Sequence, residues 1–189
     1  MPIQQILLIL LLYSPLQDAV SLEYTPAGNK IERTVHEYSH YTLRWGNQHF
    51  MRSLPDTFNT FGLNNPGLWY ESNLYLLLNV NLMQGGSSVF VLPLNDSSQI
   101  ARFNDPIVFN PKLNLLAYIH SPRTIKIIEL SSGKTSSLIV PLPRGVKDLR
   151  NCIQSTTLTG TELYIHWVDT PRSTIKIYRF PKLKSRHAP

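Results

Sequence analysis

Short apolar runs alternate with clusters of turn residues along most of this chain. The runs are rich in β-branched, leucine and aromatic residues and occupy residues 74–82, 89–92, 115–119, 124–130, 163–168 and 173–180. Glycine, serine, proline and aspartate stand between them, as in Gly85-Gly86 and Ser132-Gly133. Apolar runs of this length between turn residues are typical of β-hairpins. We therefore expect a mostly β fold built from antiparallel hairpins.

Two hairpins in the second half of the chain repeat one residue pattern. The shared segments are Tyr-Ile-His at 118–120 and 164–166, Pro-Arg at 122–123 and 171–172, and Thr-Ile-Lys-Ile at 124–127 and 174–177. The copies lie 46 residues apart at the first strand (118 to 164) and 50 at the second (124 to 174), which predicts a longer turn in the later hairpin. A period of about 40–50 residues with several strands per unit is typical of propeller blades. Alternation along a strand places Ile125 and Ile127 on one face of the sheet.

Three segments in the second half of the chain resemble a known repeat. They are Pro-Ile-Val-Phe-Asn-Pro at 106–111, Leu-Ala-Tyr at 116–118 and Ile-Lys-Ile-Ile-Glu-Leu-Ser-Ser-Gly-Lys at 125–134. Together they resemble a propeller repeat of the TolB type, and also a WD-type repeat without its Trp-Asp pair. The resemblance covers roughly residues 70–180 and implies a partial or degenerate β-propeller. Propellers close with about four or more blades and the sequence shows about three, so a β-sandwich is the alternative.

The amino terminus has the pattern of a secretory signal peptide. Residues 6–13 are all apolar or aromatic, a run too short for a membrane span of about 20 residues but suited to a signal-peptide core. Small residues at Ala19 and Ser21 then predict cleavage near Leu22. We therefore expect a signal peptide at 1–21, one β-rich domain at 22–181 and a basic tail at 182–189. Because residues 1–5 hold no lysine or arginine, an intracellular chain that buries this run in its core is the alternative.

Composition narrows the possible partners. The net charge is +6, but the basic residues are scattered apart from the group Lys182, Lys184 and Arg186. Since neither a basic helix nor a glycine-aromatic platform accompanies the charge, we expect no nucleic-acid binding and no membrane span. The single cysteine, Cys152, excludes an intrachain disulfide and a four-cysteine zinc site. In a secreted eukaryotic protein, the sequon at Asn95 would predict N-glycosylation.

One motif carries potential chemistry. His36-Glu37-Tyr38-Ser39-His40 matches H-E-x-x-H, in which two histidines on one helix face bind zinc and the glutamate activates water. A third ligand would be His49 or Glu71. The β-branched and aromatic flanks favour a strand, on which the histidines would lie roughly 13 Å apart. We therefore expect no cofactor, and we keep a zinc metallopeptidase with Glu37 as the base and His36, His40 and Glu71 as ligands as the alternative.

The sequence predicts a secreted or extracytoplasmic binding module. Turns of repeated hairpins gather on one rim, where exposed arginine and aromatic side chains are common anchors of protein recognition. The candidate binding residues are Arg123, Arg172, Tyr118, Tyr164 and Trp167. We expect a protein partner, and exposed sheet edges would also allow self-association.

Overall fold

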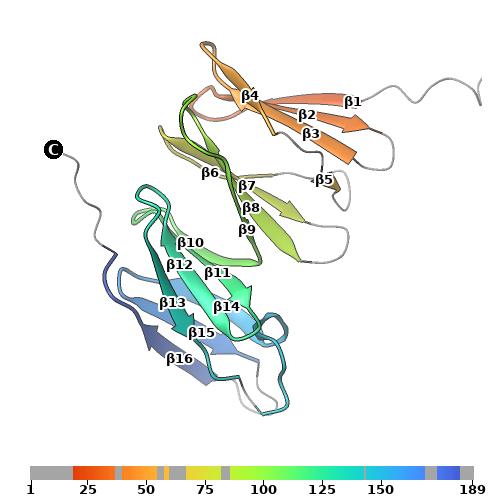
Figure 1. Cartoon of the computed structure of the whole chain (residues 1–189). Coiled ribbons are helices and arrows are strands. Elements are labelled where there is room, and N and C mark those ends of the chain that lie inside the picture. Colours follow the sequence, from red (N-terminus) through yellow and green to blue (C-terminus); the bar gives the residue numbers. More distant parts are fainter. Residues whose placement is uncertain are drawn as a thin grey trace, which may run out of the picture.

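The computed structural model describes residues 19–36, 40–54, 58–59, 67–81, 86–142, 144–168 and 174–183 (Figure 1). These residues form strands in four antiparallel sheets, and their single helical element is a 3-10 turn, η2, at Leu149–Asn151. The prediction of a mostly β fold built from antiparallel hairpins is confirmed. Within the described ranges, no helix is long and apolar enough to cross a membrane.

The strands follow one another in chain order within each sheet. Sheet 1 contains β1 (Ala19–Tyr24), β2 (Lys30–His36), β3 (His40–Gly46), β4 (Met51–Ser53) and β5 (Phe58–Asn59), which also pairs with β3. Sheet 2 contains β6 (Gly67–Glu71), β7 (Tyr75–Asn81), β8 (Ser87–Pro93) and β9 (Ala101–Asn104). Sheet 3 contains β10 (Pro106–Asn110), β11 (Leu115–Ser121), β12 (Thr124–Glu129) and β13 (Thr135–Ile139). Sheet 4 contains β14 (Ile153–Leu158), β15 (Glu162–Trp167) and β16 (Thr174–Arg179).

Each sheet packs against the next one along the chain, as Figure 1 shows. One apolar cluster joins sheets 1 and 2 through Trp45 and Leu78, a second joins sheets 2 and 3 through Leu77 and Phe109, and a third joins sheets 3 and 4. Leu77 and Leu78 are both fully buried although they point to opposite faces of β7. Sheets 2 and 3 are therefore covered on both faces, which explains the continuous apolar runs of their central strands.

The first strands of sheets 2, 3 and 4 share a local irregularity. The pairing with the second strand shifts register between Leu68 and Tyr70 in β6, between Pro106 and Val108 in β10, and between Ile153 and Ser155 in β14. The extra residues are Trp69, Ile107 and Gln154. A β-bulge bends its strand and redirects a side chain. Three consecutive sheets thus have a β-bulge in their first strand.

The two similar hairpins differ in register. In sheet 3, Ile119 lies opposite Ile125, whereas in sheet 4 Ile165 lies opposite Lys176 and His166 lies opposite Ile175. A shift of one residue turns a strand's side chains to the other face. Ile119 consequently faces sheet 4, while the equivalent Ile165 faces back towards sheet 3, and both belong to the cluster between these sheets.

The isoleucines of the repeated Thr-Ile-Lys-Ile strands have different environments. Ile125 and Ile127 share one face of β12, as predicted, and both are 0% exposed because sheet 4 covers them. The equivalent Ile175 and Ile177 in β16 are 66% and 53% exposed. The repeat in sequence therefore does not give equal burial.

Candidate functional site

The bulged first strands of sheets 2, 3 and 4 lie side by side. The ring of Phe109 in β10 lies 5.9 Å from Trp69 and 5.1 Å from Tyr70 in β6, measured between centroids. On the other side of β10, the Thr156 hydroxyl donates to the Ile107 carbonyl at 2.9 Å. β10 thus contacts the first strand of the sheet before it and the first strand of the sheet after it.

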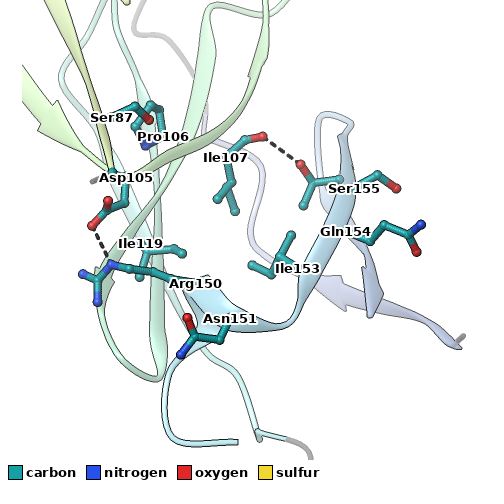
Figure 2. Close-up of a pocket in the computed structure, with 12 residues that line it drawn as sticks. Ser87, Asp105, Pro106, Ile107, Ile119, Arg150, Asn151, Ile153, Gln154 and Ser155 are labelled. Atoms are coloured by element: carbon teal, nitrogen blue, oxygen red, sulfur yellow. Dashed lines mark hydrogen bonds and ion pairs between the residues drawn. The ribbon is translucent and has the colours of Figure 1, made fainter. Parts of the chain in front are cut away.

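A groove of about 790 Å³ opens between β10 and β14, and Figure 2 shows its lining. Ile107 and Ile153 point toward each other across it, and Ile119 completes the apolar middle. Asp105 and Arg150 lie together on one side, and Gln154 and Ser155 lie on the other (Figure 2). Two bulged residues, Ile107 and Gln154, thus form part of the lining.

An ion-pair network closes one side of the groove. The Arg150 guanidinium donates from Nε to Asp105 Oδ2 at 2.7 Å and from Nη1 to Asp148 Oδ2 at 2.6 Å. Asp148 also caps η2 by accepting from the Arg150 backbone N–H. The hydrogen bond with Asp105, opposed by partial burial and helped by both carboxylate charges, raises the pKa of Arg150 above its usual value. Two carboxylates around one guanidinium leave this side of the groove with a formal charge of −1.

Asp105 also holds two sheets together through its backbone. It adopts a left-handed conformation with φ of 50°, which aspartate tolerates better than most residues. Its N–H donates to the Ser87 carbonyl at 2.8 Å, and its carbonyl accepts from the Ile119 N–H at 3.0 Å. The carboxylate is therefore fixed at the junction of sheets 2 and 3.

The groove combines apolar and polar groups. Its middle is apolar, and amide, hydroxyl and charged groups stand around it. The residues that line it include no histidine or cysteine, and no group of three or more histidine, cysteine, aspartate or glutamate side chains that could hold a metal occurs among the described residues. The arrangement can orient and hold a ligand through hydrogen bonds and apolar contact.

The H-E-x-x-H segment lies neither on a helix nor along one strand. His36 is the last residue of β2, His40 is the first of β3, and the two are direct cross-strand partners. Glu37 lies outside the described residues. Both geometries considered from the sequence, one helix and one strand, are therefore wrong, because the two histidines belong to two antiparallel strands. His36 Nε2 lies 3.1 Å from the Thr42 hydroxyl.

Glu71, the proposed third ligand, is engaged in the structure of sheet 1. Its Oε1 accepts from the Thr25 hydroxyl and from Asn29 Nδ2 at 2.8 Å, and its Oε2 accepts from the Ala27 N–H at 3.0 Å. Partial burial alone would raise the pKa of Glu71, but these hydrogen bonds outweigh it and lower the pKa. The carboxylate ties the β1–β2 turn to the end of β6.

The four predicted binding residues that the structure describes are not gathered on one surface. Trp167 is 1% exposed in the cluster between sheets 3 and 4, so its expected exposure is wrong: alternation along β15 places it on the inner face with Leu163 and Ile165. Tyr118 packs on Phe103 at 5.0 Å toward sheet 2. Tyr164 lies on the opposite face of β15 from Trp167 and donates to Glu162 at 2.7 Å. Arg123 is exposed in the β11–β12 turn, and Arg172 lies outside the described residues.

Asn95, the predicted glycosylation site, forms part of an Asx turn. Its side-chain oxygen accepts from the backbone N–H groups of Ser97 at 3.1 Å and Ser98 at 2.7 Å. Its carbonyl accepts from Arg52 of sheet 1 at 2.7 Å. Glycosylation at Asn95 stays a prediction.

The groove residues were not identified from the sequence. Asn104-Asp105-Pro106 carries a turn signal, but nothing in the sequence indicates that Asp105 pairs with Arg150. The bulges at Ile107 and Gln154 likewise leave no mark in the residue pattern.

No protein-family model, no curated protein sequence and no solved structure matches this chain.

Proposed function

We propose that this chain is a secreted or extracytoplasmic β-repeat module that binds an extended segment of a partner protein in the groove between β10 and β14. The observation that carries the proposal is the groove itself, with its apolar middle and fixed polar margins. Sites that bind ligands are concave, and a small number of placed polar groups fix the orientation of the ligand.

The sheets are consecutive blades of a partial β-propeller in this proposal. Chain-order strands within each sheet, packing of each sheet on the next, and a bulge in each first strand of sheets 2 to 4 support equivalent units. A sandwich would bury one face of each of two sheets, whereas sheets 2 and 3 are covered on both faces. This arrangement supports the TolB-like or WD-like resemblance over residues 70–180.

A peptide segment is the ligand that the groove fits best. Within the described residues β10 and β14 each pair with one strand only, so backbone groups on their other edges, apart from the Ile107 carbonyl that accepts from Thr156, can pair with an extended ligand. The isoleucines would receive an apolar side chain of that ligand, and Gln154 and Ser155 would bind its amides. Asp105 and Asp148 around Arg150 together carry a formal charge of −1, which favours a basic residue at that end.

Secretion of the module is supported by the amino-terminal pattern. Cleavage after Ser21 would remove three of the six residues of β1 and would leave Leu22 to Tyr24 paired with Lys30 to Glu32. The Glu71 hydrogen bonds to the β1–β2 turn lie beyond the cut and would still hold the shortened strand to sheet 2.

A displayed peptide library tests the proposal. We expect selection on the folded protein to yield peptides with an apolar residue beside a basic one. Gln154→Trp, which places an indole in the groove, should weaken their binding at least tenfold. Gln99→Trp is the matched control, because Gln99 is exposed outside the groove, and it should bind like the parent. Equal binding by both variants, or no selected peptide, would contradict the groove as the site.

A further inference from the structure

Strand β16 is a third strand that lacks a fourth. In sheets 1, 2 and 3 the third strand, β3, β8 or β12, is paired on both sides. Within the described residues β16 pairs only with β15. Residues 174–177 of β16 are all exposed, whereas β8 is mostly buried and β12 has no exposed residue. An interior type of strand is therefore left at a sheet edge, where unpaired backbone groups can template another strand.

Strand β12 shows what fits beside this sequence. Its Thr-Ile-Lys-Ile segment pairs with β13, which places Leu138 opposite Ile125, Ser137 opposite Lys126 and Ser136 opposite Ile127. Strand β16 repeats these four residues at 174–177. The same side-chain order, apolar and then small or polar, is thus expected of a strand that pairs with β16.

The charge of β16 indicates which kind of strand could pair with it. Lys176 and Arg179 are exposed on β16, Lys182 follows, and β16 itself carries no acidic residue. Glu162 of β15 offsets only Arg179, at 2.9 Å. Antiparallel pairing of β16 with a second copy of itself would bring the lysine and arginine of both copies onto one ladder, and would place like charges directly opposite in the registers where Lys176 or Arg179 faces a basic residue, which disfavours a dimer at this edge. An acidic segment meets no such penalty.

The chain that follows β16 does not cover the edge. Phe180 is buried in the cluster between sheets 3 and 4, and Leu183 packs against the same cluster. The Phe180 N–H donates to the Thr161 carbonyl at 2.9 Å. Residues 180–183 thus turn toward the core, and the edge stays open within the described part of the chain.

We infer that β16 accepts an extended acidic segment of a partner protein as the fourth strand of sheet 4. Main-chain hydrogen bonds along the edge supply the affinity. An apolar residue beside Ile175 and a carboxylate beside Lys176 supply the specificity. This strand site is separate from the groove, which β16 does not line.

A labelled peptide based on the sequence of β13 tests this inference. The probe is Thr-Ser-Glu-Leu-Ile-Val, which repeats residues 135–140 with glutamate in place of Ser137, so that its carboxylate faces Lys176 in the β12–β13 register. We expect saturable binding by fluorescence anisotropy and slower hydrogen exchange of the amides in β16. Lys176→Glu should weaken binding about fivefold, because an attractive cross-strand pair becomes repulsive. A second peptide with lysine in place of that glutamate should restore the affinity.

Matched controls show whether the peptide binds at the β16 edge. Lys126→Glu changes the equivalent residue of β12, whose edge β13 already occupies, and should not alter binding. Gln154→Trp should not alter it either, so this inference and the groove proposal can fail independently. N-methylation of alternate peptide amides on the pairing edge should abolish binding.

Three results would overturn the inference. The first is no binding of the probe, and the second is binding that is insensitive both to Lys176→Glu and to N-methylation. The third is a concentration-dependent dimer that protects β16 amides without peptide, which would assign the edge to a second copy of the chain.

Discussion

The two equivalent isoleucines of the repeated strands give a direct test of the sheet packing. Ile125→Ala removes three carbon groups from a side chain that sheet 4 covers completely. Transfer of these groups contributes about 2.4 kcal/mol at roughly 0.8 kcal/mol each. A residual cavity adds to this, so we expect a total loss of about 3–4 kcal/mol in the free energy of unfolding.

Ile175→Ala makes the same chemical change at an exposed position. Ile175 is 66% exposed, so about a third of the transfer free energy is lost, no enclosed cavity forms, and the expected cost is below about 1 kcal/mol. The lower strand propensity of alanine affects both variants alike. The difference between them should therefore be about 2–3 kcal/mol.

Urea denaturation followed by tryptophan fluorescence measures both variants. The midpoint should fall much further for Ile125→Ala, with the slope unchanged from the parent. Equal losses for the two variants would refute the reasoning, because they would mean that Ile175 is as well covered as Ile125. Repetition at two protein concentrations shows whether such cover comes from another copy.

Four further outcomes are expected. Glu71→Gln should lower the free energy of unfolding by about 1–2 kcal/mol at neutral pH. Because the folded pKa of Glu71 is lowered from 4.5, this difference should be present above that value and vanish as the pH falls through the folded pKa. The Cys152 thiol, whose pKa burial raises with help from the nearby Asp148 charge, should react with a thiol reagent in urea but hardly in the native protein. Protein purified without chelator should hold less than one zinc per chain, and zinc near one equivalent that is lost in His36→Ala would contradict this. Intact-mass analysis of natively produced protein should show a chain that begins near Leu22, whereas retention of Met1 would contradict secretion.

The strands could be predicted from the sequence because their signals are local. Runs such as 74–82 and 124–130 alternate or are continuously apolar, and glycine, serine and proline mark their ends. The β7 and β12 strands follow these runs closely. The sheet order also follows, since short turns join antiparallel neighbours.

The candidate site could not be predicted, because it depends on contacts between distant segments. Asp105 meets Arg150 only after sheets 3 and 4 have packed, and Ile107 and Gln154 enter the groove only because their strands bulge. Tryptophan is a common anchor in protein recognition, but Trp167 lies on the same face of β15 as Leu163 and Ile165, and this face is buried against sheet 3. The placement of His36 and His40 on two antiparallel strands could not be predicted either, because no residue pattern marks the end of β2 and the start of β3.

The sequence by itself determined that the chain past residue 70 forms hairpin strands and that hairpins repeat, since propensity and alternation act over a few residues. Only the tertiary structure decided register, burial and the position of the groove. The isoleucines of the same Thr-Ile-Lys-Ile segment are buried in β12 and exposed in β16. Because the four residues are identical, the segment itself cannot account for this difference in burial. It arises because sheet 4 covers one copy while no described sheet covers the other, and apolar burial depends on that neighbour.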